Sequence, residues 1–248
     1  MLGIRRITGA KPGLGLIGVG AFGEFCIPHL KPHFELALHD PFRQLGTGLP
    51  GAAAQDIVLL AVPVAAIAEV AAEIAPHLRP GTLVLDVCSI KVKPLAALAA
   101  LLPEHVAIVG THPLFGPQSG RNGIRGLHLS LCEVRGGRAP AVARFLRRRL
   151  GLEVILTTPE LHDQQMAYVQ GLSHLIGRIV AGMDLPPLQQ TTSSFEHLMR
   201  LVETVRHDSD ELFRTIAVEN PFVDPVAAGF FRVASELQRR ISAPPPGA

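Results

Sequence analysis

The chain has 248 residues, of which 48% are hydrophobic and 18% are charged, and its formal net charge is +2. This composition is typical of a globular protein and excludes a disordered one, and the length allows one large domain or two modest ones. The small net charge does not favour nucleic acid as a partner. No stretch approaches the ~20 apolar residues that a membrane-spanning helix needs.

The cysteines are Cys26, Cys88 and Cys132, which are too few and too scattered for a disulfide framework or a zinc site. Each lies in an apolar stretch, so we expect buried thiols in a reducing compartment and no metal site. The N-terminal residues do not have the pattern of a signal peptide. We therefore expect a soluble, cytoplasmic protein that binds neither membrane nor nucleic acid.

The first 158 residues alternate short apolar runs with helical patterns. The expected strands are 14–18, 35–39, 56–62, 82–87, 106–110, 129–134 and 153–157. The expected helices are 21–30, 63–75, 93–102 and 140–150. This alternation predicts an α/β domain with an open, doubly wound, mostly parallel sheet of the Rossmann type over residues 1–158.

From residue 159 onward the pattern is helical and the strand signals vanish. The expected helices are 160–182, 194–206, 209–218 and 225–241. One apolar face of the first helix is expected to be core and comprises Met166, Val169, Leu172, Ile176, Ile179 and Met183. Ninety residues give little material for a closed core, so residues 159–248 are expected to form an all-helical substrate and dimerisation domain of a homodimer.

A G-x-G-x-x-G pattern directly follows the first strand and opens the first helix. The residues are Gly18, Gly20 and Gly23, with Ala21 and Phe22 between the last two. The first glycine allows a tight turn, the second lets a pyrophosphate approach the backbone, and the third lets helix and strand pack closely. The bare pattern is weak, but its position after a strand and before a helix predicts a dinucleotide-binding site.

Asp40 ends the second expected strand, twenty residues after Gly20. A carboxylate there accepts hydrogen bonds from both ribose hydroxyls and repels a 2′-phosphate, which favours NAD over NADP. Arg43 lies nearby and could reach a 2′-phosphate, so the alternative stays open. Val62 and Pro63, at the end of the third strand, are expected to contact the same cofactor.

Two further strand ends carry side chains suited to chemistry. His112 follows the strand 106–110 in a loop rich in glycine and proline, and histidine is the side chain best suited to take a proton at neutral pH. Hydride removal from an alcohol needs such a base. Ser89 follows the preceding strand and either hydrogen-bonds the histidine or the substrate, or is a plain helix N-cap.

The first helix of the second domain carries a polar face. Asp163, Gln170 and His174 lie at i, i+7 and i+11 and therefore share one side of a regular helix. The face is either part of a substrate pocket or simply solvated, and periodicity alone does not decide between them.

Four segments resemble those of the prephenate/arogenate dehydrogenases. Residues 86–91, Asp-Val-Cys-Ser-Ile-Lys, look like the family's segment ending Ser-x-Lys. Residues 110–117 are close to its His-Pro-Met-Phe-Gly-Pro loop, with Leu114 where methionine is usual. His162-Asp163 and Ser173-His174 match two landmarks of its helical domain. The resemblance runs from the glycine pattern to about Asn220.

The resemblance implies an NAD-dependent oxidative decarboxylation in tyrosine biosynthesis, carried out by a homodimer. His112 would draw the proton from the ring hydroxyl and Ser89 would orient it. His174 and Gln118 would line the substrate pocket, together with Lys91 of the Ser-x-Lys segment. The substrates implied are arogenate, prephenate or both.

The sequence departs from the family's pattern at one position expected to recognise the substrate's side chain. Many bacterial members carry an arginine where this chain, aligned without gaps, has Thr204, and the stretch 195–203 looks more like the plant arogenate enzymes. Arg200 lies one helical turn away and is the candidate replacement. Since Asp163 or Glu203 would favour an ammonium group, arogenate is predicted to be the better substrate.

Two alternatives remain at the level of sequence. A hydroxyacid or imine reductase of the same architecture would use a lysine or another base on the helical domain, and the chain has no lysine after Lys93. A non-catalytic, NAD-responsive binding protein would leave His112 and Ser89 without a role.

Overall fold

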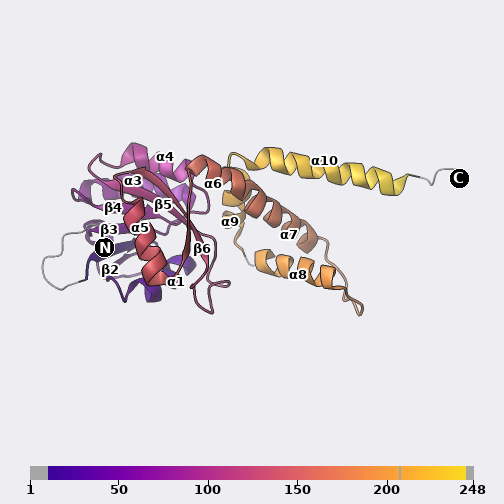
Figure 1. Ribbon diagram of the computed structural model, residues 1–248, viewed down its shortest axis with the longest axis horizontal. Coiled ribbons are helices and arrows are strands. Elements are labelled where there is room, and N and C mark those ends of the chain that lie inside the picture. Colours follow the sequence, from indigo (N-terminus) through magenta and orange to yellow (C-terminus); the bar gives the residue numbers. More distant parts are fainter. Residues whose placement is uncertain (1–10, 207, 244–248) are drawn as a thin grey trace. The chain divides into compact units, whose positions relative to one another are not determined.

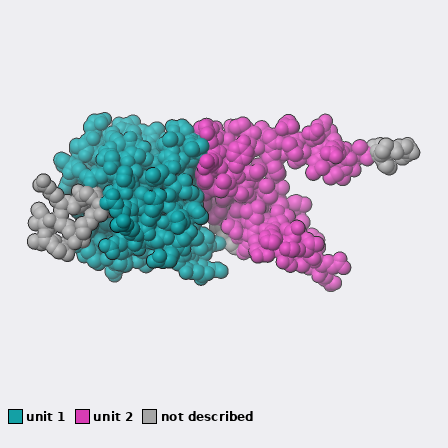
Figure 2. All heavy atoms as spheres, viewed as in Figure 1, with its two compact units in different colours: residues 1–162 teal, residues 163–248 magenta. Residues whose placement is uncertain are grey.

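The computed structural model describes residues 11–206 and 208–243, and the segment examined above for a signal peptide lies largely outside this range. Two compact units are present, residues 1–162 and 163–248 (Figure 2). None of the helices in the part of the chain that the structure describes has the length and hydrophobicity of a membrane-spanning segment.

The first unit is built on one seven-stranded sheet with the order β2-β1-β3-β4-β5-β6-β7 (Figure 1). The strands are β1 (Gly13–Ile17), β2 (Glu35–His39), β3 (Ile57–Leu60), β4 (Leu83–Asp86), β5 (Ala107–Pro113), β6 (His128–Arg135) and β7 (Glu153–Leu156). The first five strands are parallel, so their carboxyl ends meet at one edge of the sheet. The α/β fold predicted from the alternating pattern is confirmed.

Helices cover both faces of this sheet. They are α1 (Ala21–Leu30), α2 (Gly48–Ala53), α3 (Ile67–Ile74), α4 (Val92–Leu101) and α5 (Ala139–Phe145). Short 3₁₀ turns, η1 (Val64–Ala66) and η2 (Ala75–His77), flank α3, and the π-helical turn η3 (Leu146–Leu150) continues α5. The chain order of strands and helices therefore gives a doubly wound sheet.

Each face of the sheet has its own hydrophobic core, because side chains alternate along a strand. Val58 and Leu60 of β3 point into the core shared with α2, α3 and α4. Ile57 and Leu59 point into the core shared with α1 and α5. Burial on both faces explains why the strands appear in the sequence as continuous apolar runs.

Three features of this unit differ from the sequence-based expectations. Helix α2 was not predicted, since its sequence, Gly-Leu-Pro-Gly-Ala-Ala, has low helix propensity. Strand β6 is antiparallel to β5, because no crossover helix separates them. Strand β5 continues to Pro113 and does not end at Gly110, since β6 pairs with the extension. His112 therefore lies on a paired strand and not on a loop.

The second unit contains only helices among the residues described. Helix α6 (Pro159–Met166) leads through the π-helical segment η4 (Ala167–Leu172) into α7 (Ser173–Gly182). Then follow α8 (Ser193–Arg206), α9 (Asp210–Arg214), the π-helical η5 (Thr215–Glu219) and α10 (Val223–Ser242). Helix α7 packs against α8, and α10 packs against η4.

The prediction that one apolar face of the first long helix is buried as core is largely wrong for a single chain. Met166 is buried, whereas Val169, Ile179 and Met183 are exposed. The π-helical segment η4 is one reason, because a wider turn shifts every later residue around the helix axis. It also breaks the regular spacing that placed Asp163, Gln170 and His174 on one side.

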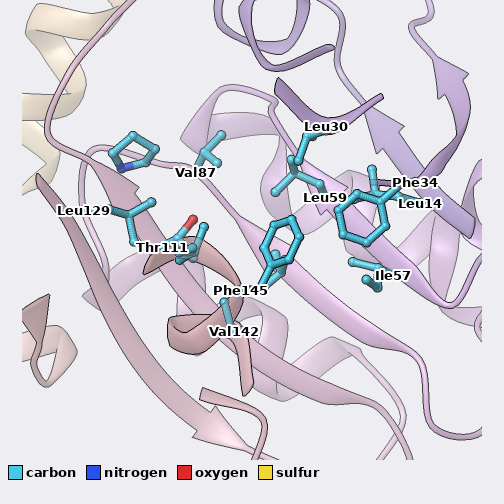
Figure 3. Close-up of a pocket in the computed structure, with 13 residues that line it drawn as sticks. Leu14, Leu30, Phe34, Ile57, Leu59, Val87, Thr111, Leu129, Val142 and Phe145 are labelled. Atoms are coloured by element: carbon cyan, nitrogen blue, oxygen red, sulfur yellow. The ribbon is translucent and has the colours of Figure 1, made fainter. Parts of the chain in front are cut away.

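A cavity of about 80 Å³ lies between the sheet and the helices α1 and α5 (Figure 3). It is lined by Leu14, Leu30, Phe34, Ile57, Leu59, Leu85, Val87, Thr111, Pro113, Leu129, Val142, Phe145 and Leu146. Of these, Thr111 alone has a polar side chain, and its hydroxyl donates to the Asp86 carbonyl oxygen. Such a lining does not suit a charged ligand, so we treat the cavity as a packing defect.

Filling this cavity is expected to stabilise the protein. Val142→Ile adds one methylene group at the cavity wall and should raise the free energy of unfolding by about 0.5–1 kcal/mol. The matched control is Val58→Ile in the other core, where Val58 is buried and does not line the cavity. Overpacking there should cost about 1–3 kcal/mol. Urea unfolding measures both, and equal effects of the two substitutions would contradict the assignment.

Candidate active site

The loop between β1 and α1 has the backbone shape that its three glycines predict. Gly18 has φ +90, a conformation that favours glycine. A Cβ atom on Gly23 would lie 2.1 Å from the Gly18 carbonyl oxygen, so helix and strand approach too closely for any side chain. A Cβ on Gly20 would meet no atom within 4 Å. The loop is therefore tight at its first and third glycines and open at its second.

Asp40, at the end of β2, is tied to this loop. Its Oδ2 accepts a hydrogen bond of 2.7 Å from the Val19 backbone N–H, and its Oδ1 accepts one of 2.9 Å from that of Phe42. Arg43 Nη1 lies 3.5 Å from Glu24 Oε2 on α1, so this guanidinium has a carboxylate partner within the protein. The carboxylate of Asp40 thus contacts Val19, the residue before the open second glycine.

These features fit a dinucleotide. The open space at Gly20 and the N–H groups of the first turn of α1 suit a pyrophosphate, and a carboxylate at the end of β2 suits a ribose diol. Val62 lies against Gly18, since its Cγ1 is 2.9 Å from where a Gly18 Cβ would be. Ala21 and Pro63 are exposed beside the loop, and Phe22 packs against Phe25.

A buried ion pair lies where β4 ends. Lys91 Nζ pairs with Asp86 Oδ2, and both side chains are inaccessible to solvent. The same ammonium donates to the Thr111 carbonyl oxygen on β5 at 2.7 Å, while Asp86 Oδ2 also accepts from the Cys88 backbone N–H at 3.0 Å. Lys91 was expected to bind substrate. That prediction is not tested by the structure, in which Lys91 is completely buried beside Thr111, the residue before His112 on β5.

His112 lies on β5 and contacts a second histidine. Its Nδ1 is 2.9 Å from Nε2 of His162, and the two rings meet edge to face. The exposed fractions are 3% for His112 and 1% for His162. His162 belongs to α6, whose first turn begins at Pro159. The pair is therefore a buried contact between a strand of the sheet and the helix that follows its last strand.

The protonation state of His112 follows from these surroundings. Burial, then the neighbouring His162, then the cation of Lys91 hold the pKa of His112 well below the usual 6.5 of a histidine. At neutral pH His112 is consequently uncharged and able to accept a proton. This is the property required of a general base.

Two other residues expected near the reacting groups, Ser89 and Gln118, are less buried than His112. Ser89 follows β4 and is half-buried, and the structure contains no hydrogen bond between its hydroxyl and His112. Gln118 is exposed in the segment between β5 and β6. Neither position conflicts with a contact to a bound substrate.

The second unit holds the remaining expected substrate residues. Asp163 is completely buried, and its carbonyl oxygen accepts a 2.9 Å hydrogen bond from Asn220. His174 is held from both sides, with Nδ1 2.8 Å from the Gln170 carbonyl oxygen and Nε2 3.0 Å from Asp208 Oδ2. Its ring is therefore fixed in orientation by residues of its own unit.

Thr204 and Arg200 lie on the exposed side of α8. The Thr204 hydroxyl donates to the Arg200 carbonyl oxygen at 2.8 Å, one helical turn back. Arg206 is paired with Glu203 at 3.4 Å. Among the residues described, Arg200 makes no ion pair, so its guanidinium is available to a carboxylate.

Sequence reasoning did not single out His162 and Asp86 as residues of the candidate site. The sequence did contain a signal for His162, namely the His162-Asp163 pair at the start of a helix. Only the fold brings His162 to His112 on β5, fifty residues earlier in the chain. Asp86 appeared simply as the last residue of a strand, and its link to Lys91 depends on the turn between them.

Comparison with known proteins agrees with this geometry. Residues 42–129 match the family described as "Prephenate dehydrogenase, nucleotide-binding domain". The chain is 31% identical over 230 residues to arogenate dehydrogenase 2, chloroplastic, of Arabidopsis thaliana, covering 84% of this chain and 64% of that one. It is 29% identical over 191 residues to a probable arogenate/prephenate dehydrogenase of Methanocaldococcus jannaschii, covering 73% of this chain and 43% of that one. The chain thus spans less than two thirds of either relative.

The fold is also that of a solved structure. The crystal structure of prephenate dehydrogenase from A. aeolicus in complex with hydroxyphenyl propionate and NAD+ superimposes with a TM-score of 0.73 at 19% identity. The match covers 95% of this chain and 92% of that one, so it includes both the sheet and the helical residues. Together with the order of the four sequence landmarks, these matches show that the chain belongs to the prephenate/arogenate dehydrogenase family.

Proposed function

We propose that the protein is an NAD-dependent dehydrogenase that oxidatively decarboxylates arogenate and, less efficiently, prephenate. The observation that carries the proposal is the uncharged, buried His112 at the same edge of the sheet as the glycine loop. Parallel strands bring these two features to the edge where α/β enzymes bind their ligands. The names of the matched relatives support the choice of substrate class.

The proposed reaction needs a hydride acceptor, a base and a fixed orientation of the substrate. NAD+ bound at the glycine loop supplies the hydride acceptor. His112 would take the proton from the ring hydroxyl as the ring carbon that bears this hydroxyl loses its hydride. Carbon dioxide then leaves the opposite ring carbon, its bonding electrons make the ring aromatic, and the oxygen takes back a proton. Because His112 is fixed on β5, its ring would already be oriented toward the bound substrate, and such orientation contributes a large part of this kind of catalysis.

The preference for arogenate rests on charge near the substrate's side chain. Prephenate carries a keto acid there, and arogenate carries an amino acid. A prephenate site benefits from an arginine that binds the carboxylate with two parallel hydrogen bonds. Thr204 occupies the position where the resemblance expects that arginine, so no cation at this position repels the ammonium group of arogenate. Arg200, one turn away, acts against this preference. Ser89, Gln118 and His174 remain our candidates for further substrate contacts.

An assay with both substrates and both cofactors tests the proposed function. We expect reduction of NAD with arogenate at a higher kcat/KM than with prephenate, and a lower efficiency with NADP because Asp40 repels a 2′-phosphate. His112→Asn should lower turnover by about 10²–10⁴-fold, the usual contribution of a general base. Turnover by this variant above a tenth of the original value would remove His112 from the mechanism. A preference for prephenate would mean that Arg200 or another cation replaces the missing arginine.

The cofactor site has a test that does not depend on turnover. Gly20→Ala places a methyl group in the open space of the loop, and we expect at least ~10-fold weaker binding of NAD by calorimetry, with the melting temperature almost unchanged. Gly46→Ala is the matched control, because a Cβ there also meets no atom within 4 Å but lies outside the loop. Equal NAD affinity in the two variants would contradict the assignment of the loop.

We propose that the protein is a homodimer formed through its helical residues. Helix α10 has twenty residues, of which Val223 alone is buried among those described. Val233, Leu237 and Ile241 follow one another at four-residue intervals and are 55%, 53% and 76% exposed. A second copy would cover this apolar stripe, and such interfaces commonly bury ~1,600 Å² or more with an apolar centre.

A charge within the stripe is expected to disrupt the dimer. Leu237→Glu should give a monomer mass in light scattering at micromolar concentration, because a carboxylate would be buried without a partner. Gln238→Glu adds the same charge to the neighbouring, polar position of α10 and should leave the dimer intact. A monomeric original protein, or equal masses for the two variants, would refute the assignment of α10 to the interface.

A further inference from the structure

The contact between His112 and His162 is not explained by packing alone. Two imidazoles meet nitrogen to nitrogen at 2.9 Å, and one must donate while the other accepts. Both rings are buried, so solvent does not choose between the two arrangements. The arrangement that forms decides which nitrogen of His112 bears a proton and which carries the lone pair.

We propose that His162 is a positioning residue that accepts a hydrogen bond from Nδ1–H of His112 and so makes Nε2 of His112 the proton-accepting nitrogen. The role assigned to Nε2 rests on the proposed function, whereas the tautomer itself does not. His162 then corresponds in function to the third group of a nucleophile–base–orienter arrangement, supplied here by a neutral ring.

Charge around the pair favours a neutral acceptor over a carboxylate in this position. Lys91, preceding α4, places a cation behind His112, and Asp86 of β4 pairs with that cation. A carboxylate in the place of His162 would stabilise the protonated form of His112 and raise its pKa. A neutral imidazole fixes the ring and stabilises the protonated form less than a carboxylate would, so His112 stays unprotonated at neutral pH.

The proton transfer remains balanced with this assignment. The substrate O–H bond breaks and a bond forms between that proton and Nε2 of His112, which becomes a cation. Its Nδ1–H hydrogen bond to His162 strengthens as the charge appears, because hydrogen bonds from charged donors are stronger. The proton returns from Nε2 when the aromatic oxygen is released.

Two substitutions separate positioning from packing. His162→Gln keeps an acceptor oxygen at a similar reach and should retain kcat within a few-fold. His162→Leu keeps the apolar volume and removes the acceptor, and should lower kcat by about 10- to 100-fold with little change in KM. Thermal unfolding of both variants establishes that each is folded. Equal kcat in folded His162→Leu and His162→Gln would overturn the proposal.

The pH profile gives a second readout. A base whose pKa lies below its usual value is active above that pKa and loses activity as the pH falls through it. His162 is one cause of the lowered pKa of His112, after burial and before Lys91. Both substitutions remove the ring, so this contribution changes equally in the two variants. His162→Leu also removes the acceptor that stabilises protonated His112, so the acid limb of its kcat/KM profile should lie at lower pH than that of His162→Gln. Coincident acid limbs in the two variants would contradict a direct hydrogen bond from His112 to His162.

The tautomer is measurable without substrate or cofactor. Nitrogen NMR of histidine-labelled protein, with His112→Asn used to assign the signal, should show His112 protonated at Nδ1 and unprotonated at Nε2 at neutral pH. A proton on Nε2 would overturn the inference whatever the activity. The predicted tautomer in a protein that turns over neither arogenate nor prephenate would uphold the positioning contact and overturn the proposed function alone.

Discussion

The buried ion pair between Lys91 and Asp86 is the interaction on which the geometry of the site depends. The pair joins the end of β4 to the turn after it, and Lys91 also donates to β5 at the Thr111 carbonyl oxygen. Thr111 in turn donates to the Asp86 carbonyl oxygen, so β4 and β5 stay linked beyond their regular ladder. Removing either charge would leave the other buried without a partner, which typically costs about 3–5 kcal/mol. The position of the next residue, His112, is therefore strongly fixed.

The same ion pair sets an electrostatic condition on His112, the proposed base. A cation close to a histidine opposes protonation, and burial acts in the same direction. The partner of His112 must consequently hold the ring without adding a negative charge. In our proposal, a second histidine that accepts through its lone pair meets this condition, whereas an aspartate would offset the effect of Lys91. The structure of the site thus combines two demands: the imidazole is held in place, and it stays unprotonated at neutral pH.

The parts of the site that were predictable are those encoded within a few consecutive residues. The glycine loop follows from Gly18, Gly20 and Gly23, because each glycine satisfies a local steric demand. His112 was predicted to be a base from its position after an apolar run, and this role stays a proposal. By contrast, the contact of His112 with His162, and the continuation of β5 through His112, depend on pairing with β6 and on the placement of α6. Such contacts join residues far apart in sequence, and no local pattern reports them.

The helical residues show a different limit of sequence reasoning. A periodic apolar stripe reports that a helix face is buried, but it does not say which molecule buries it. Val233, Leu237 and Ile241 of α10 have the pattern of core residues and yet remain exposed in a single chain. The π-helical segment η4 adds a second difficulty, because a single wider turn shifts the faces of α6 and α7 relative to a regular helix. An apolar stripe that its own chain leaves uncovered is therefore most informative about assembly, and less so about the fold of the chain that carries it.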